Sequence, residues 1–212
     1  GNACLSGLLT GEMGTKYRPV NAESKGCGTV MRSAPFGLLP YVSEETVYKF
    51  SADGAALTHG HPSALHSAAV FSSLIHDLLP AGATLQEAAA AAAERAARSG
   101  VPELAERLQA AVSLAAENRG STASVSPEQM KQALGEGWVA EEALAIGLYA
   151  ALAASNAGTP QEHFRRAVGL SVNHDGDSDS TASVTGNILG VLYGLKALPA
   201  DWLSAIDARE TV

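Results

Sequence analysis

Runs of helix-favouring residues constrain the fold more than any other feature of this sequence. The segment TLQEAAAAAAERAARS, residues 84–99, opens with Thr84 and Glu87 in a capping-box pattern. It closes with Arg95 and Arg98, whose charges suit the negative end of a helix dipole. Alternating runs of β-branched residues, which would indicate strands, are nearly absent. The sequence therefore predicts an all-α fold with less than about a tenth of its residues in strands.

Caps and prolines divide the rest of the chain into further helices. Ser43 is an expected N-cap, and Pro62 and Pro160 stand where a first helical turn tolerates proline. The apolar segment 137–155 is expected to be central to the core, and residues 13–33 lack a period and are predicted to form a loop. We expect a compact orthogonal multi-helix bundle, a single domain over residues 1–212, with further helices at 43–57, 62–79, 102–118, 127–135, 159–170 and from the aspartate-rich loop to about 197.

The charge balance argues against one class of partner. The 212 residues carry a formal net charge of -8, whereas a nucleic-acid surface needs clustered lysine and arginine. No segment has the pattern of a signal peptide or a transmembrane helix. Cys4 and Cys27 stand outside any CxxC pattern, which favours a reduced, cytoplasmic setting, with a single disulfide as the alternative. We therefore expect a soluble protein with no nucleic-acid or membrane partner.

Three aspartates, Asp175, Asp177 and Asp179, occupy alternate positions before a glycine-rich helix. Carboxylates this close repel one another, and a hard divalent cation makes such an arrangement favourable. The alternative is a solvated acidic loop, with Asp179 or Ser180 as the N-cap of the helix. An EF-hand is excluded, because loop positions six and twelve would be Ser180 and Gly186. The oxygens of Asp177, Asp179 and Ser180 favour magnesium, manganese or calcium over zinc.

Small residues recur every four positions along the helix that follows, at Ala182, Gly186, Gly190 and Gly194. This spacing places them on one face of the helix. Each glycine costs about 1 kcal/mol of helix propensity relative to alanine, so a compensating contact is expected. The sequence predicts that this stripe packs tightly against a neighbouring helix in the core.

The sequence resembles the ADP-ribosylglycohydrolases in four segments that occur in the family's order. The segments are SKGCGTVMRSAPFGLL (24–39), THGHPSA (58–64), GEGWVAEEALAIGLYAAL (135–152) and DGDSDSTASVTGNILG (175–190). The resemblance implies that Asp177, Asp179 and Ser180 are ligands of a paired Mg²⁺ or Mn²⁺ site, with both aspartates in the catalytic centre. It also implies that a loop containing Ser24, Gly26, Cys27 and Gly28 holds ADP-ribose, and that His59 lies near the diphosphate.

The chain departs from the family pattern in three places. Asp175 stands where glycine is usual, and Cys27 stands where several relatives have asparagine. The family's N-terminal third carries a Thr-Asp-Asp motif, and no Asp-Asp pair occurs in these residues. The chain therefore resembles the C-terminal two thirds of a family member, with half of the metal ligands absent. The resemblance implies a hydrolase acting on ADP-ribosylated protein side chains or related ADP-ribose conjugates. The alternative is a non-catalytic relative, either an ADP-ribose-binding module or a crystallin-like structural protein.

Four further candidates each have a structural alternative. His59, His61 and His66 could suggest zinc, but a fourth ligand is lacking and surface or capping histidines are favoured. Arg32 could bind phosphate or serve as a structural ion-pair partner. Trp138 could stack on adenine or pack in the core. Cys27 is a weak candidate nucleophile, because the sequence identifies no activating base.

We expect residues 24–28 and 58–60 to converge on the aspartate-rich loop.

Overall fold

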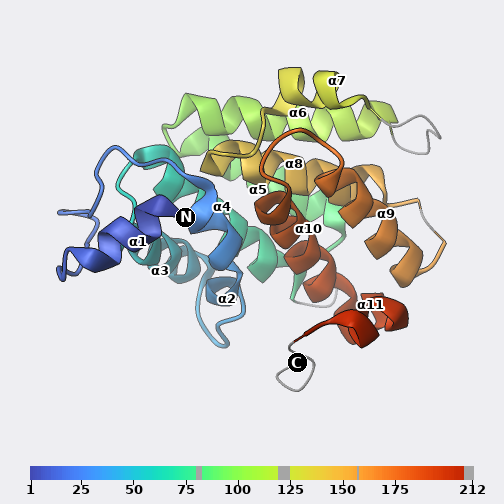
Figure 1. The fold of residues 1–212 in the computed structure, drawn as a ribbon, viewed down its shortest axis with the longest axis horizontal. Helices are drawn as coiled ribbons and strands as arrows, with labels where there is room; N and C mark the ends of the chain where they lie inside the picture. The colour runs from blue at the N-terminus through green and yellow to red at the C-terminus, as the bar shows by residue number, and fades with distance from the viewer. Residues whose placement is uncertain (80–82, 119–124, 157, 208–212) are drawn as a thin grey trace.

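Helix α8 (Ala140–Ala153) lies at the centre of the structure, and other helices pack around it. The computed structural model describes residues 1–79, 83–118, 125–156 and 158–207, and within it every residue of α8 except Glu142 is buried. Figure 1 shows α8 with its neighbours, which are α4 (Pro62–Leu78), α6 (Pro102–Asn118), α9 (Pro160–Val172) and α10 (Ser178–Tyr193). The apolar segment 137–155 therefore forms the central helix, as predicted.

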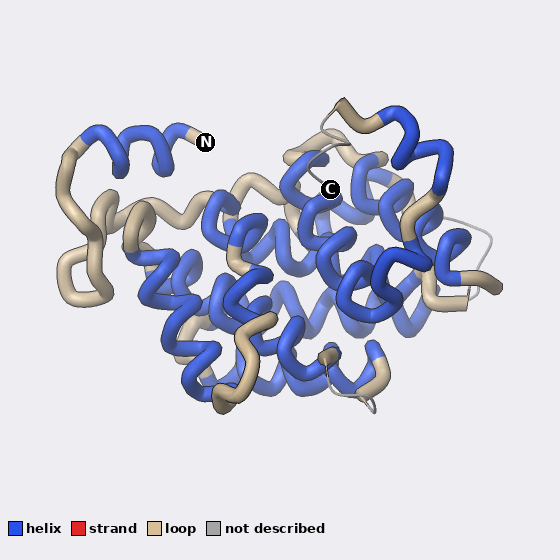
Figure 2. Tube along the Cα trace, turned by 90° about the horizontal axis from the view of Figure 1, so that it is seen from below, coloured by secondary structure: helices blue, strands red, loops and turns tan. Residues whose placement is uncertain are grey.

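The remaining elements are also helical. They are α1 (Asn2–Leu9), the 3₁₀ helix η1 (Cys27–Arg32), α2 (Ala34–Gly37), α3 (Glu44–Ala56), α5 (Leu85–Arg98), α7 (Pro127–Leu134), the 3₁₀ helix η2 (Gly194–Ala197) and α11 (Ala200–Ala205). The structure is 71% helical and the described residues form no sheet, as the tube in Figure 2 shows. The predicted all-α class and the compact arrangement of many helices are confirmed.

The predicted helix starts are confirmed by their capping contacts. Ser43 accepts a hydrogen bond from the amide of Thr46, and Thr84 forms both bonds of its capping box with Glu87. Helix α4 starts at Pro62 and ends at Leu78, while Pro80 lies outside the described residues. Because a cap satisfies backbone donors within one turn, it depends on local sequence and can be predicted without knowledge of the tertiary contacts.

The predicted loop over residues 13–33 is wrong for its last third. Residues 27–32 form η1, and Gly28, Thr29 and Val30 within it are buried. A short 3₁₀ helix has about three residues per turn and leaves no 3.6-residue pattern in the sequence. Its position is fixed by contacts with α4 and α8.

The prediction for the small-residue stripe is also wrong. A Cβ on Gly190 would meet no heavy atom within 4 Å, and one on Gly186 would only reach Phe164 at 4.0 Å. Gly194 has a φ of 62° and ends α10 instead of continuing it. The stripe borders an open groove, of about 380 Å³, that is lined by Ala34, Leu38, Ile75, Leu79, Gly186, Asn187, Gly190 and Val191. The close approach to α10 is made by Gly147 of α8, where a Cβ would lie 2.5 Å from Val184 Cγ1.

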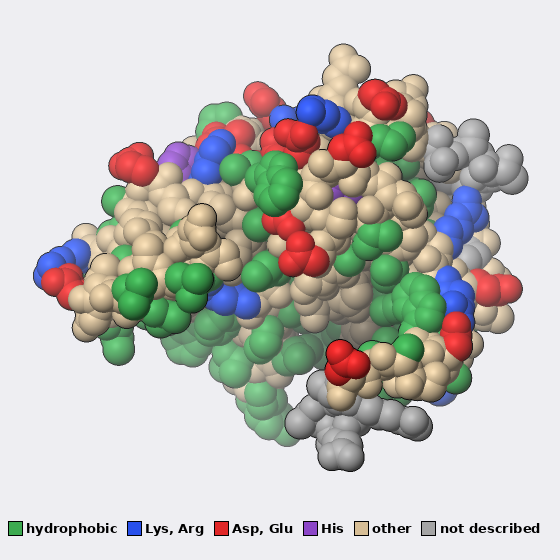
Figure 3. All heavy atoms as spheres, viewed as in Figure 1, with side chains coloured by type: hydrophobic (Ala, Val, Ile, Leu, Met, Phe, Trp, Pro, Cys, Tyr) green, Lys and Arg blue, Asp and Glu red, His purple; other side chains and the backbone are tan. Residues whose placement is uncertain are grey.

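The surface agrees with the acidic composition. On the face in Figure 3, outside the grey residues, acidic and basic side chains are interspersed and no large basic patch is visible. Among the described residues, no helix combines the length and apolar character needed to cross a membrane.

These contacts predict opposite effects for two glycine-to-alanine substitutions. Gly147→Ala should lower the free energy of unfolding by about 1–3 kcal/mol, because the new methyl group forces α8 away from Val184. Gly190→Ala should raise it by about 0.5–1 kcal/mol, because alanine favours the helix and the space is open. Urea unfolding of the 212-residue chain measures both changes. A Gly147→Ala variant as stable as Gly190→Ala would contradict the proposed close packing of α8 and α10.

Candidate functional site

The aspartate-rich loop meets the glycine-rich loop at the start of α10. Asp177 occupies the N-cap position of α10 and is only 7% exposed. Its Oδ2 lies 2.7 Å from Cys27 Sγ, and Cys27 Sγ lies 3.5 Å from Ser180 Oγ. Residues 150 positions apart are thus in direct contact. The expected convergence of these two loops is confirmed, whereas the N-cap that the alternative of a solvated acidic loop placed at Asp179 or Ser180 is Asp177.

The protonation states of Asp177 and Cys27 follow from this contact. Burial, with a smaller contribution from the hydrogen bond to Asp177, raises the pKa of the Cys27 thiol to about 12. Burial alone would raise the pKa of Asp177, but hydrogen bonds from Cys27 and with Asp179 and Ser180 outweigh it and lower the pKa below its ordinary value. At neutral pH the thiol therefore donates to an ionised carboxylate. Such a thiol is a poor nucleophile, in agreement with the sequence.

The main chain of the aspartate loop is held against residues 136–137. The amide of Asp177 donates to the carbonyl of Glu136 at 2.8 Å. A side chain at Gly176 would collide with that same carbonyl, so only glycine permits this approach. The Glu142 carboxylate in turn accepts the amides of Glu136 and Gly137 at 3.0 and 3.2 Å. The first turn of α8 thereby positions the backbone on which Asp177 rests.

The glycine-rich loop is joined to the same segment by backbone bonds. The amide of Cys27 donates to the carbonyl of Trp138 at 3.1 Å, and the amide of Ala140 donates to the carbonyl of Lys25 at 2.9 Å. Ser24 accepts the amide of His61 through its carbonyl at 3.3 Å. Three segments of the chain, 24–28, 58–61 and 136–140, are thus joined through main-chain atoms.

His59 lies beneath the glycine-rich loop. It is 1% exposed, and its Nδ1 is 2.7 Å from Thr58 Oγ1. A Cβ on Gly26 would lie 3.3 Å from His59 Nε2, and one on Gly28 would lie 3.4 Å from Cε1, so both glycines pack on the ring. Burial, with a smaller contribution from the charge of Arg32, lowers the pKa of His59 to about 4. The imidazole is therefore neutral at physiological pH.

Arg32 links η1 to α3 and to the segment that follows α3. Its guanidinium donates to the carbonyls of Gly28 and Gly54 at 2.9 and 3.2 Å, and to the hydroxyl of Thr58 at 2.8 Å. These contacts favour the structural role over phosphate binding, although the partners are carbonyl and hydroxyl oxygens and not a carboxylate.

Three further residues that the sequence singled out are exposed to solvent. Asp179 is exposed in the first turn of α10, and Asp175 is exposed close enough to Lys131 for its charge to help raise the pKa of that lysine, after the larger effect of Glu136. Trp138 is 57% exposed, so the alternative of core packing is wrong. Both cysteines are free thiols, so the disulfide alternative is excluded.

A zinc site built from the three histidines is also excluded. His61 caps α4 by accepting the amide of Ser63, and His66 bonds to the Tyr48 hydroxyl at 2.7 Å. Within the described ranges, no three side chains of histidine, cysteine, aspartate or glutamate are grouped so that they could hold a metal. Any cation at the start of α10 would therefore need oxygen ligands beyond the two carboxylates.

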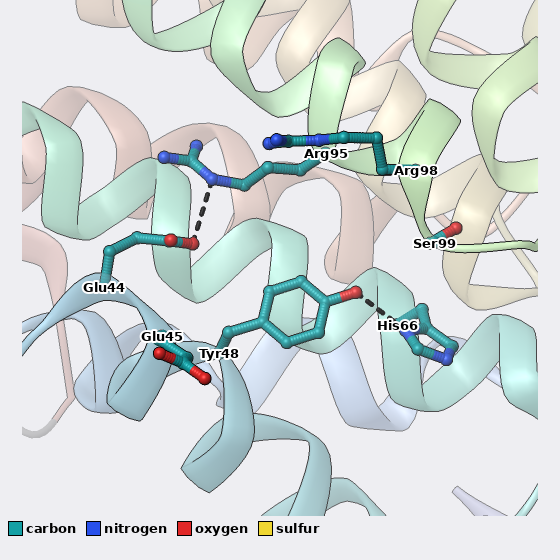
Figure 4. Close-up of a pocket in the computed structure, with 7 residues that line it drawn as sticks. All are labelled: Glu44, Glu45, Tyr48, His66, Arg95, Arg98 and Ser99. Atoms are coloured by element: carbon teal, nitrogen blue, oxygen red, sulfur yellow. Dashed lines mark hydrogen bonds and ion pairs between the residues drawn. The ribbon is translucent and has the colours of Figure 1, made fainter.

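Figure 4 shows a hollow of about 320 Å³ in a different part of the fold, between α3, α4 and α5. Within it, Arg95 already pairs with Glu44 at 2.9 Å and with Asp77 at 2.6 Å. Of the candidate site residues singled out in the sequence, the hollow is lined only by His66, whose role in a zinc site is excluded above. The residues that the family resemblance implies lie instead at the starts of η1, α8 and α10 and in the segment before α4.

Sequence reasoning missed the residues that shape these loops. Glu142 binds two backbone amides, and His174 is buried against the aspartate loop with bonds to Gly176 and Thr181. Neither position carries a periodic or capping signal. The position of His174 two residues before a glycine could have suggested a side-chain bond to the backbone of the turn.

The described geometry is that of an all-α protein whose site is assembled from loops at helix N-termini. The sequence profile of the ADP-ribosylglycohydrolases matches residues 1–212, and the chain belongs to this family. It is 27% identical to a solved structure described as an ADP-ribosylglycohydrolase-related protein complex, with a TM-score of 0.67. The match covers 99% of this chain and 63% of that one, so this chain spans less than two thirds of its length. A search of curated proteins found no match.

The buried His59 predicts an acid-dependent loss of stability. The unfolded chain binds a proton at His59 near pH 6.5, whereas the folded chain resists protonation until about pH 4. The stabilising contribution is therefore present above pH 6.5 and is lost as the pH falls towards 4. Relative to His59→Gln, the wild type should lose about 2–3 kcal/mol more over this interval, measured by urea unfolding at several pH values. Parallel stability curves would contradict the assignment.

The half-buried Cys27, with its raised pKa, predicts slow alkylation. In a Cys4→Ser background at pH 8, Cys27 of the folded chain should react with iodoacetamide roughly a hundredfold more slowly than in urea, because its raised pKa suppresses the thiolate. Asp177→Asn removes the negative charge beside the thiol and should accelerate the reaction. Mass spectrometry over time measures both rates. Equal rates in the folded and unfolded chains would show that the thiol is not buried against Asp177.

Proposed function

We propose that the two loops form part of the active site of a divalent-metal-dependent hydrolase, which cleaves the glycosidic bond between ADP-ribose and a protein side chain or a related conjugate. The observation that supports this most directly is the buried, ionised Asp177 at the start of α10, in contact with the glycine-rich loop. Family membership supplies the reaction class. Metal dependence and the conjugate that is cleaved are our inferences.

Asp177, Asp179 and Ser180 are the residues that would hold Mg²⁺ or Mn²⁺. They offer three hard oxygen donors on a single helical turn, and the low pKa of Asp177 keeps it ionised. Cys27 occupies Oδ2, so Oδ1 is the oxygen with which Asp177 can reach a cation without losing the thiol bond. When bound, the ion would hold ribose hydroxyls and stabilise charge that develops near the anomeric carbon.

The glycine-rich loop and Trp138 would position ADP-ribose. Ser24, Gly26, Cys27 and Gly28 are partly or fully buried, and the packing of Gly26 and Gly28 on the neutral ring of His59 fixes the loop. The Thr58 hydroxyl accepts from Arg32 and lies 2.7 Å from His59 Nδ1, so the orientation of the ring beneath the glycines is held by a side-chain contact. We infer that His59 acts on the diphosphate through the loop. Trp138, whose carbonyl accepts the Cys27 amide, has an exposed side chain that is available to stack on adenine.

A non-catalytic ADP-ribose-binding function is the second candidate. One observation favours it: the described residues contain no group of three histidine, cysteine, aspartate or glutamate side chains suited to a metal. A binding module needs the glycine-rich loop and Trp138 but not a complete cation site. The two candidates therefore differ in their dependence on Mn²⁺, which the hydrolase requires and the binding module does not.

Manganese binding tests the proposed ligands. The chain should bind Mn²⁺ weakly, with a dissociation constant on the order of a millimolar, because water must supply most of the coordination. Asp177→Asn and Asp179→Asn should each weaken binding roughly tenfold or more, while Asp175→Asn, which is exposed towards Lys131, serves as the matched control. Water proton relaxation measures all four affinities. An Asp179→Asn affinity equal to that of the wild type would refute the assignment of Asp179.

Hydrolysis separates the enzyme from the binding module. ADP-ribose titrations followed by NMR should shift the signals of residues 24–28 and the Trp138 indole. Release of ADP-ribose from an ADP-ribosylated peptide in the presence of Mn²⁺, and its loss in Asp177→Asn, would support the hydrolase. Binding of ADP-ribose that Mn²⁺ leaves unchanged, in the wild type and in Asp177→Asn alike, would favour the second candidate for residues 1–212.

A further inference from the structure

His174 lies at the base of the aspartate loop and has no part in the function proposed so far. It is 9% exposed, and both of its ring nitrogens have partners. Nδ1 accepts the backbone amide of Gly176 at 3.1 Å, and Nε2 lies 3.0 Å from Thr181 Oγ1. The ring therefore joins the residue before Asp177 to the residue after Ser180.

The partners determine where the proton of this imidazole resides. A backbone amide can only donate, so Nδ1 carries no proton and the neutral ring is protonated at Nε2. Nε2 then donates to the Thr181 hydroxyl, which has one proton of its own to donate. The nearest acceptor is the carbonyl of Ser171 at 2.6 Å, and the carbonyls of Asp177 and Ser178 lie at 3.0 and 3.1 Å. Hydrogen bonds thus run continuously from Gly176 through His174 and Thr181 to the end of α9.

The candidate cation ligands lie between the two points at which His174 holds the chain. Asp177, Asp179 and Ser180 all fall between Gly176 and Thr181. On the other side of the loop, the carbonyl of Glu136 accepts the amide of Asp177. The turn is therefore fixed both by main-chain contact with the segment before α8 and by the side chain of His174.

We propose that His174 is a positioning residue, which holds the turn 177–180 in the geometry that binds the cation. The inference rests on the proposed function, because it assumes that Asp177, Asp179 and Ser180 are the ligands. A buried imidazole with both nitrogens bonded maintains one orientation of the turn before any ion arrives, so less ordering is required on binding. Without His174, Gly176 loses its acceptor and Thr181 loses its donor, and the turn can relax although α10 remains helical.

His163, which lies in α9, provides a matched control. It is 1% exposed, its Nε2 bonds to the carbonyl of Ala151 at 2.8 Å, and its Nδ1 bonds to the Tyr193 hydroxyl at 2.8 Å. Tyr193 is at the far end of α10 from Asp177. Removing either ring deletes a buried histidine with two hydrogen bonds, but only His174 borders the candidate ligands.

The experiment compares Mn²⁺ affinity and thermal stability in four variants. His174→Ala and His163→Ala should lower the melting temperature to a similar extent, whereas only His174→Ala should weaken Mn²⁺ binding, by roughly 10- to 100-fold. His174→Asn can still accept the Gly176 amide in an Asx-turn and should recover part of the affinity. Thr181→Val removes the second contact and should give an intermediate loss. Equal affinity losses in His174→Ala and His163→Ala would overturn the proposal.

Two further measurements separate failure of this inference from failure of the proposed function. ¹⁵N NMR of the imidazole should show the Nε2-protonated neutral form of His174, and its absence would overturn the proposal directly. If the wild type binds no Mn²⁺, the assignment of Asp177, Asp179 and Ser180 as ligands is refuted. The positioning role is then judged by amide exchange at residues 176–180, which should accelerate in His174→Ala and not in His163→Ala, and unchanged exchange would overturn it.

Discussion

The burial of α8 is the constraint on which the rest of the structure depends. A helix that is apolar on nearly every face can only be stable when other helices enclose it, and α4, α6, α9 and α10 do so. The one residue of α8 that is not buried, Glu142, lies in its first turn and binds the amides of Glu136 and Gly137. The position of the central helix thereby determines the position of the segment against which both site loops rest.

A second constraint is electrostatic and concerns Asp177. A buried carboxylate is expected to become protonated unless hydrogen bonds stabilise its charge. The Cys27 thiol provides one such bond, and its own ionisation is suppressed, first by burial and then by its contact with Asp177. Asp177 and Cys27 together therefore carry one negative charge, which lies on the buried carboxylate at the N-terminus of α10. The helix dipole supplies only about half a compensating positive charge. In the function proposed above, a cation would supply the remaining compensation, and Cys27 would take no part as a nucleophile.

The sequence predicts local features of this fold well and contacts between distant segments less well. Thr84 and Glu87 form their capping box because every atom involved lies within one turn. The meeting of Cys27 with Asp177 could be anticipated only through the family resemblance. Gly190 shows the limit, because a glycine on a helix face looks the same in sequence whether a neighbouring helix or an open groove lies beside it. Gly147, which does make the close approach, is a single glycine inside an apolar run and gives no comparable pattern.

Backbone contacts and side-chain contacts have different roles in these loops. Backbone atoms join the loops to one another, through Cys27 to Trp138, Asp177 to Glu136 and Ala140 to Lys25. Such bonds persist when most side chains are replaced, so residues in the loops can change without loss of their arrangement. Side-chain identity is constrained where a backbone carbonyl excludes it, as at Gly176, or where a side chain bonds the loop, as at His174. Cys27 bonds the carboxylate of Asp177 through its side chain, but its backbone amide is what joins it to Trp138. Its replacement should therefore alter the charge and affinity of the Asp177 site while leaving the loops in place.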